Sequence, residues 1–276
     1  MTTGGDTTTM TYNSQDTTQK PATAARIYDY YLGGIHNFPA DQAAAKTLLA
    51  QFPCIPAVAR ANRAFMRRAV RRLVDAGIRQ FLDIGSGIPT AGNVHEIAQA
   101  AVPDTRVVYV DIDPMAVAES LEILEGNKLA TAVRADVRTP EVVLDHPGVQ
   151  RLLDLGQPVG LLLVGVLHFV PEDAVAYEAV ARFVDALAPG SYVVVSHAAS
   201  EAFEHLYQQS EIKDDVYRQR TPTPGTARTR PGVERFFTGL KVMDPGVVLS
   251  SDWWPDPDEV LEPDGNGSWV GVGQRT

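Results

Sequence analysis

Between residues 79 and 198, short apolar runs alternate with segments of helical character. The runs are RQFLDIG (79–85), RVVYVDI (106–112), TAVRAD (131–136), PVGLLLVGVLHF (158–169) and GSYVVVSHA (190–198). Near-continuous Val, Leu and Ile runs are typical of parallel strands buried on both faces and joined by right-handed crossovers. We expect the crossover helices at 93–101, 114–124 and 172–187. The pattern predicts an α/β fold with a doubly wound, mostly parallel sheet.

The N-terminal part of the chain departs from this alternation. Residues 1–20 are rich in Thr, Gln and Gly and offer little to bury, so we expect a disordered tail. Residues 21–77 contain two helical patterns, at about 41–51 and 55–76. They predict a helical cap that precedes the core at 78–276.

The C-terminal part also breaks the rhythm. A lid-like insertion is expected at about 200–237, which begins as a helix and breaks into a loop of prolines and glycines. Tyr207, Tyr217 and Arg230 in this insertion could line a pocket. The apolar stretches 239–254 and 267–275 have no crossover helix between them, so we expect an antiparallel pair at the edge of the sheet.

Composition excludes several classes of function. No apolar run approaches the roughly 20 residues that cross a bilayer, and the first residues do not form a signal peptide, so we expect a soluble cytoplasmic protein without membrane contact. A single cysteine, Cys54, excludes an intrachain disulfide, and we expect no metal site. The net charge of −10 argues against nucleic acid as a partner. Six arginines at 60–72 predict the solvated face of an amphipathic helix, and a basic binding patch is the alternative.

The first predicted strand ends in LDIGSGIPT, with Asp83, Gly85 and Gly87. Glycines at this point allow a tight turn and a close approach to a nucleotide-like ligand. A dinucleotide fingerprint would need Gly or Ala where Thr90 stands, and an apolar residue where Asp83 stands. An acid there suits the cationic end of S-adenosylmethionine better than a pyrophosphate.

Aspartates also end the second and third predicted strands. Asp111 in YVDIDP is placed to accept both hydroxyls of a ribose, whereas Asp113 suits the N-cap of the following helix. Asp136 in RADV is placed to accept a hydrogen bond from an adenine amino group. Three solvated turn aspartates are the simpler alternative.

The fourth and fifth predicted strands end in histidines, His168 in GVLHFVPED and His197 in VVVSHAAS. Each alone could be a structural histidine with its hydrogen bonds satisfied. Both would still lie on the rim of one cleft, so at least one is expected to face the cofactor or the acceptor. His168 is the first candidate for a general base and His197 the second.

Several segments together resemble a known family. In order they are ARIYDYYLGGIHNFPAD, ANRAFMRRAVRRL, IRQFLDIGSGIPTAGNVHE, RVVYVDIDP, LLLVGVLHFVPED and PGSYVVVSHA. They resemble the actinobacterial S-adenosylmethionine-dependent methyltransferase family that was first catalogued as a domain of unknown function. The resemblance covers about residues 22 to 276. It implies a Rossmann-like class I methyltransferase core with an N-terminal helical cap.

The resemblance also implies roles for individual residues. The methionine end of the cofactor would lie against Asp83, Gly85, Ser86 and Gly87. Asp111 would hold the ribose, with Ile112 beside the adenine and Asp136 and Val137 bordering it. Leu167 and His168 would lie under the sulfonium.

The stretch RIYDYYLGGIHNFPAD (26–41) fits neither an ordinary helix nor an ordinary strand. We expect it to fold back over the carboxyl ends of the sheet as a lid, with Gly33 and Gly34 permitting the reversal. Its candidates for shielding the cofactor or contacting the acceptor are Tyr28, Tyr30, Tyr31, His36, Asn37 and Phe38. Alternatively, the tyrosines only attach the N-terminal helices to the core.

The function predicted from the sequence is methyl transfer from S-adenosylmethionine to an O, N or S nucleophile of a small molecule, by in-line displacement. One alternative is a protein that binds S-adenosylmethionine without transferring a methyl group. A second is a nicotinamide-dependent oxidoreductase. The sequence does not predict the oligomeric state.

Overall fold

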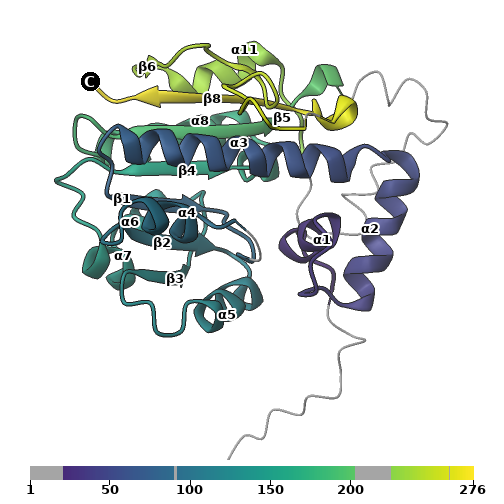
Figure 1. Cartoon of the computed structure of the whole chain (residues 1–276), viewed down its shortest axis with the longest axis horizontal. Coiled ribbons are helices and arrows are strands. Elements are labelled where there is room, and N and C mark those ends of the chain that lie inside the picture. The colour runs from purple at the N-terminus through teal and green to yellow at the C-terminus, as the bar shows by residue number, and fades with distance from the viewer. Residues whose placement is uncertain (1–20, 90–91, 203–224, 261) are drawn as a thin grey trace, which may run out of the picture.

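A computed structural model describes residues 21–89, 92–202, 225–260 and 262–276 (Figure 1). The expected disordered tail at 1–20 lies outside the described residues, as does most of the expected insertion, including Tyr207 and Tyr217. No helix within the described ranges is long and apolar enough to cross a membrane.

The centre of the molecule is an eight-stranded sheet in the order β3-β2-β1-β4-β5-β8-β6, with β7 also paired to β8. Strands β1 to β5 are parallel, as the alternation predicts. The register places Asp111 opposite Arg134 and Ile84 opposite Val110, so β1, β2 and β3 end at a similar level. The parallel strands are β1 (Gln80–Ile84), β2 (Arg106–Asp111), β3 (Ala130–Arg134), β4 (Gly160–Val164) and β5 (Tyr192–Ala198).

The expected antiparallel edge is present, but one of its two predicted strands is divided into two short ones. β8 (Ser268–Gln274) runs antiparallel to β5 along seven residue pairs, from Tyr192↔Gln274 to Ala198↔Ser268. The stretch 239–254 gives only two short strands, β6 (Lys241–Val242) and β7 (Val248–Leu249), both paired to β8. Pro245, in a turn between them, cannot donate a ladder hydrogen bond, which accounts for the interruption.

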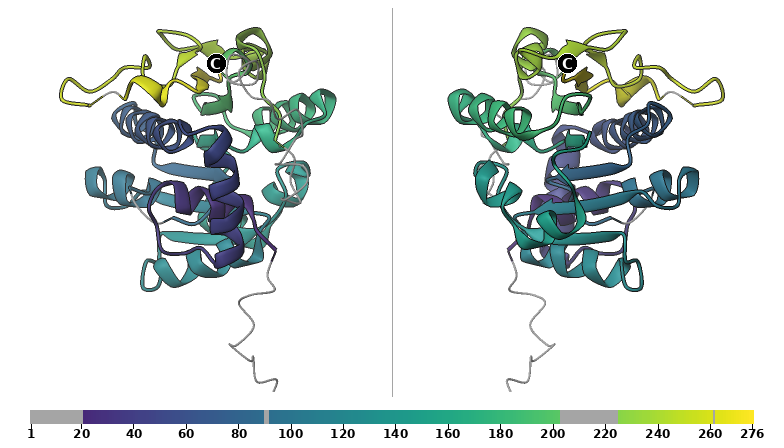
Figure 2. Two further views of the ribbon diagram at one scale, coloured as in Figure 1. Left: turned by 90° about the vertical axis from the view of Figure 1, so that its right-hand side faces the viewer. Right: turned by 90° about the vertical axis from the view of Figure 1, so that its left-hand side faces the viewer.

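Helices cover both faces of the sheet, and each face has its own apolar core (Figure 2). Strand residues alternate between the two: Phe81 packs with α3, while its neighbour Leu82 packs with α8. The first face carries α3 (Ile55–Asp75), α4 (Val94–Ala101) and α5 (Pro114–Ile123). The other carries α6 (Pro140–Leu144), α7 (Pro147–Leu152), η1 (Leu167–Phe169), α8 (Asp173–Ala186), α11 (Arg230–Glu234) and η2 (Arg235–Phe237).

The two N-terminal helices, α1 (Ala24–Tyr31) and α2 (Pro39–Gln51), stand at the carboxyl ends of the parallel strands (Figures 1 and 2). The prediction that 26–41 does not form an ordinary helix is wrong for residues 26–31, which belong to α1. Asp41 is the third residue of α2, which begins at Pro39, two residues before the predicted start, and it caps the helix by accepting a hydrogen bond from the Phe38 N–H (2.8 Å).

A buried ion pair holds α1 and α2 together. The Arg26 guanidinium lies 2.8 Å from the Asp41 carboxylate, and both side chains are almost fully buried. Asp41 also accepts from the Thr23 N–H, and Arg26 reaches Asp113 at the end of β2 (3.5 Å). Because a buried charge is tolerated only when it is paired, this network fixes the position of the cap against the core.

The arginine-rich helix α3 corrects one sequence expectation. Arg60 and Arg71 are solvated, as expected, but Arg68 is buried. Its guanidinium donates to the backbone oxygens of Ser250 and Trp253 and pairs with Glu259. The arginine pattern does not reveal this contact, because its partners lie more than 180 residues away.

Candidate functional site

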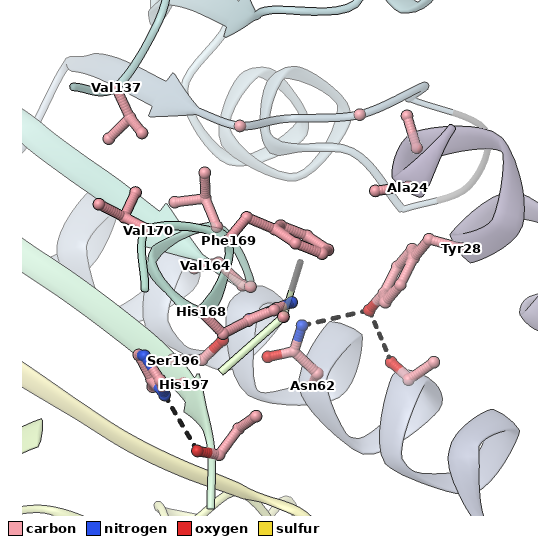
Figure 3. A pocket seen from close by; sticks show the side chains of 18 of the residues that line it. Ala24, Tyr28, Asn62, Val137, Val164, His168, Phe169, Val170, Ser196 and His197 are labelled. Atoms are coloured by element: carbon pink, nitrogen blue, oxygen red, sulfur yellow. Dashed lines mark hydrogen bonds between the residues drawn. The ribbon is translucent and has the colours of Figure 1, made fainter. Parts of the chain in front are cut away.

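A cavity of about 760 Å³ lies between the carboxyl ends of the strands and the cap helices (Figure 3). Its walls come from the ends of β1 to β5, the turn η1, helices α1 to α3 and residues 225–227. Figure 3 shows Tyr28 of the cap facing His168 and Phe169 of η1 across this space.

The loop after β1 is shaped by two glycines with left-handed backbones, Gly85 (φ +70°) and Gly87 (φ +63°). A Cβ atom on Gly85 would come within 2.2 Å of the Val166 side chain, so no larger residue fits. The N–H groups of Gly85 and Ser86 both donate to the Val110 oxygen at the end of β2 (2.7 and 3.1 Å). This turn brings the backbone of Gly85, Ser86 and Gly87 to the cavity wall.

Asp83 lines the cavity just before this loop, and its side chain is buried. Burial raises the pKa of Asp83 to about 7; the guanidinium of Arg63 opposes this rise and the carboxylate of Asp111 adds to it. A cationic group that enters the cavity would strongly stabilise the ionised form of this buried carboxyl group.

Asp111 and Ile112 lie at the end of β2. The two oxygens of Asp111 accept hydrogen bonds from the Gly87 N–H (2.8 Å) and the Asp113 N–H (2.9 Å). Burial raises the pKa of Asp111, and these two bonds oppose the rise. The side chain of Ile112 is half exposed while lining the cavity, so it offers an apolar surface for a flat ligand.

Asp136 and Val137 follow β3 and line the same end of the cavity. The carboxylate of Asp136 accepts hydrogen bonds from the Arg138 side chain at 2.9 Å. Partial burial raises the pKa of Asp136, but the hydrogen bonds from Arg138 outweigh it and hold the pKa below its usual value. Val137 is buried against the core.

The two residues expected under the sulfonium have different positions. His168 lines the cavity, whereas the side chain of Leu167 is fully buried in the core beside α8. Leu167 therefore has no place in the cavity wall, because within η1 its side chain packs into the core while those of His168 and Phe169 face the cavity. Burial, with smaller effects from His197 and Arg228, lowers the pKa of His168 to about 3, so its imidazole is neutral at pH 7.

His197 lines the cavity, but both of its ring nitrogens have partners. Arg228 donates from Nη1 to the Nε2 of His197 (2.7 Å), because a guanidinium can only donate. The proton of the imidazole is therefore on Nδ1, which lies 3.0 Å from the Ala198 oxygen. Burial lowers the pKa of His197 to about 4. With no free lone pair, His197 is poorly suited to act as a base.

The six residues singled out in the lid segment divide into two groups. Tyr28 and Tyr31 line the cavity. Tyr30, His36, Asn37 and Phe38 are not part of its wall. Three of them make contacts within the cap: Tyr30 packs in the cap core, Asn37 donates to Asp29 (2.8 Å) and Phe38 stacks on Arg26. His36 instead joins the cap to the core by pairing with Glu119 on α5 (2.7 Å).

Three residues of the cavity region are missed by the sequence reasoning. Asn62 and Arg63 on α3 reach the cavity from an arginine-rich helix face, and Arg228 holds His197 from below the wall. Arg230, which the sequence suggests for a pocket, is instead exposed on α11 and pairs with Glu234 (3.0 Å). Arg228 lies in a segment whose prolines and glycines predict only an irregular loop, so the local sequence does not indicate that Arg228 contacts the site.

Comparison with known proteins places the chain in a family. The model of a family described as S-adenosyl methyltransferase matches residues 10–276. The chain belongs to this S-adenosyl methyltransferase family. Its cofactor is S-adenosylmethionine, and it is an S-adenosylmethionine-dependent methyltransferase. Among curated proteins, none matches the chain.

Two solved structures resemble this methyltransferase over nearly its full length. A candidate methyltransferase from Thermobifida fusca YX is 37% identical, with a TM-score of 0.85, and 96% of this chain and 99% of that chain are covered. A DUF574 family protein from Streptomyces avermitilis is also 37% identical, with a TM-score of 0.86 and coverage of 93% and 98%.

A more distant structure shows the shared fold. An S-adenosylmethionine-dependent methyltransferase from Methanosarcina mazei is 14% identical, with a TM-score of 0.50, and 72% of this chain and 92% of that chain are covered. The family and the fold therefore agree with the Rossmann-like class I methyltransferase architecture that the sequence predicts.

Proposed function

We propose that this methyltransferase transfers the methyl group to an O, N or S nucleophile of a small molecule bound in the cavity beneath the cap. One observation carries the proposal: the acidic ends of three adjacent strands, the glycine loop and the cap helices all border a single cavity. A cavity of about 760 Å³ is within the range of small-molecule sites, which is about 300 to 1,000 Å³.

The residues around the β1 loop fit the cofactor. The carboxylate of Asp83 is buried and offers compensation for a cationic group, and Gly85 leaves no room for a side chain beside Val166. Asp111 keeps free lone pairs for ribose hydroxyls after accepting its two backbone hydrogen bonds. Ile112 and Val137 offer apolar surface for the adenine, and Asp136 an acceptor for its amino group.

The chain's own contribution to the reaction is mainly positioning. When bound, S-adenosylmethionine supplies the activated methyl group. The cap excludes water, and the cavity wall holds the acceptor in line, where proximity alone can lower a barrier by roughly 7 to 11 kcal/mol.

The histidines have different parts in this proposal. His197 donates to the Ala198 oxygen and accepts from Arg228, so it supports the wall. His168 stays neutral at pH 7, and we assign it to hydrogen bonding with the acceptor rather than to accepting its proton. A general base would need a pKa closer to the operating pH.

His168→Asn tests this assignment. We expect kcat to fall less than about tenfold, with an unchanged pH–rate profile between pH 6 and 9, since a general base typically contributes 10²- to 10⁴-fold. A 10²- to 10⁴-fold fall in kcat, together with the loss of a pH-dependent limb of the pH–rate profile, would show that His168 is the general base.

The cofactor part of the proposal is tested by ligand-dependent stability. S-adenosylmethionine and S-adenosylhomocysteine at about 100 times their Kd should raise the Tm by roughly 5 °C or more, and NAD should not. Asp111→Asn should weaken both effects, while Asp145→Asn, a change on the surface away from the cavity, should not. A Tm raised by NAD alone would contradict the proposal.

A further inference from the structure

The charged groups of the cavity gather at one end. Among the described lining residues, five charged side chains lie at or just after the ends of β1, β2 and β3, namely Asp83, Asp111, Asp113, Asp136 and Arg138. The other two are Arg63, whose electrostatic effect reaches Asp83, and Glu172, whose effect reaches Arg138. Six of the seven therefore belong to the side of the cavity that the cofactor-binding proposal already uses, while Arg63 acts both on Asp83 and on Tyr28 of the cap.

The opposite end is apolar and carries no charged side chain among the described residues. We call it the apolar chamber; it is lined by the end of α1, the end of α2 and the start of α3, through Tyr31, Leu48, Gln51, Phe52, Ile55 and Val58. Gln51 and the hydroxyl of Tyr31 provide the polar groups of this set.

The order of the strands separates the two ends. β3, β2 and β1 lie on one side of β4, and β5 and β8 lie on the other. The start of α3 lies over the start of β8, since a Cβ atom on Gly267 would come within 2.5 Å of Val58. Ser268 of β8 and Ser196 of β5 border the cavity at this side, so the chamber is displaced from the charged end along the sheet.

We propose that the apolar chamber binds the methyl acceptor, and that the acceptor is an uncharged aromatic compound whose hydroxyl or N–H group receives the methyl. The S–CH3 bond of S-adenosylmethionine breaks as the O–CH3 or N–CH3 bond forms, the bonding pair stays on sulfur to give S-adenosylhomocysteine, and the proton of the acceptor passes to water. This inference rests on the proposed function. An ionic acceptor would leave water for chamber walls whose described residues offer no opposite charge, which is strongly unfavourable, whereas an uncharged ring loses little. Aromatic rings from Tyr28, Tyr31, Phe52 and Phe169 provide surfaces for such a ring, and neutral Asn62 and His168 provide hydrogen bonds.

Three naphthalene probes of one ring size test the charge preference on the full chain. They are 2-naphthol, which is uncharged at pH 7, the anion 2-naphthoate and the cation 2-naphthylmethylammonium. Calorimetry in the presence of saturating S-adenosylhomocysteine should show that 2-naphthol binds at least about tenfold more tightly than either ion.

A charge placed in the chamber tests its location. Gln51→Lys adds a cation to the chamber wall, and 2-naphthoate should then bind about tenfold more tightly than to the unchanged protein. Ala50→Lys is the matched control, because it adds the same charge to the preceding residue, which lies on the exposed side of α2. It should leave the affinity for 2-naphthoate unchanged, and S-adenosylhomocysteine should bind to both variants as before.

Each outcome has one meaning. Tight binding of 2-naphthoate or the ammonium probe to the unchanged protein overturns the inference, as does the failure of all three probes while S-adenosylhomocysteine binds. An equal gain in Gln51→Lys and Ala50→Lys would overturn the location of the acceptor. Failure of S-adenosylhomocysteine to bind would instead overturn the proposed function, and the inference with it.

Discussion

Burial of the Asp83 carboxylate lowers the stability of the protein when no cofactor is bound. Its pKa rises from 3.8 to about 7 on folding, so the stability that its protonated form contributes is complete below about pH 4 and is lost as the pH rises through 7. Relative to the unchanged protein, Asp83→Asn should therefore be stabilised at pH 8, by up to about 4 kcal/mol, and not at pH 4. Urea unfolding at the two pH values measures this difference.

The same substitution separates stability from function. If Asp83 compensates the cationic cofactor, Asp83→Asn should bind S-adenosylmethionine at least about tenfold more weakly at pH 8. Asp104→Asn, on the surface, provides the control. A variant that is more stable and binds the cofactor with full strength would remove Asp83 from the binding site.

Arg228 contributes to the low pKa of His197, with which it is in direct contact. Burial is the largest cause of the low His197 pKa of about 4, and the nearby Arg228 guanidinium lowers it as well. In Arg228→Met, the His197 pKa should rise above 4 but remain below 6.5, as followed by NMR titration. Arg230→Met, in which an exposed arginine two residues away is lost, should leave the titration unchanged. An unchanged pKa in Arg228→Met would show that the contact is absent in solution.

At the scale of elements, the cap depends on one buried ion pair. Removal of one partner of such a pair leaves a buried charge and typically costs 3 to 5 kcal/mol. Arg26→Leu should lower the free energy of unfolding by about this amount, because Asp41 loses its cation. Arg60→Leu breaks an exposed pair with Glu262 and should cost less than about 1 kcal/mol. Equal losses in urea unfolding would contradict a special role for the buried pair.

The elements that the sequence predicts well are those with a local signal. The five parallel strands follow from apolar runs, and α4, α5 and α8 follow from the segments between them. α1 is missed because its apolar pattern is obscured by three tyrosines and by two charged residues, Arg26 and Asp29, that become buried once they pair with Asp41, His36 and Asn37 outside the helix. The stretch 239–254 is predicted to form one strand opposite 267–275; it pairs there, but as the two short strands β6 and β7, whose bounds are set by tertiary pairing with β8.

The candidate site shows the same division. Residues at strand ends could be found from the sequence, because the carboxyl ends of parallel strands meet at one edge. Asp83, Gly85, Asp111 and Asp136 all line the cavity for that reason. Leu167, whose neighbour His168 faces the cavity, could not be placed, since the direction of a side chain in a turn depends on its backbone.

At the scale of the whole molecule, the cavity joins two parts that have separate apolar cores. The cap core contains Ile27 and Leu48, whereas the sheet cores contain residues of the strands and of α3 to α8. A ligand in contact with both parts stabilises each relative to its open form, so binding should couple their local unfolding.

Hydrogen exchange tests this coupling and, with it, the lid. S-adenosylhomocysteine should slow exchange at the ends of β1 and β2 and also across 24–51, because Tyr28 and Tyr31 of the cap line the same cavity as Asp83. In Arg26→Leu the protection of 24–51 should be reduced while that of the strand ends remains. If the ligand protected only the strand ends in the unchanged protein, the tyrosines would serve to attach the cap to the core rather than to cover the cofactor.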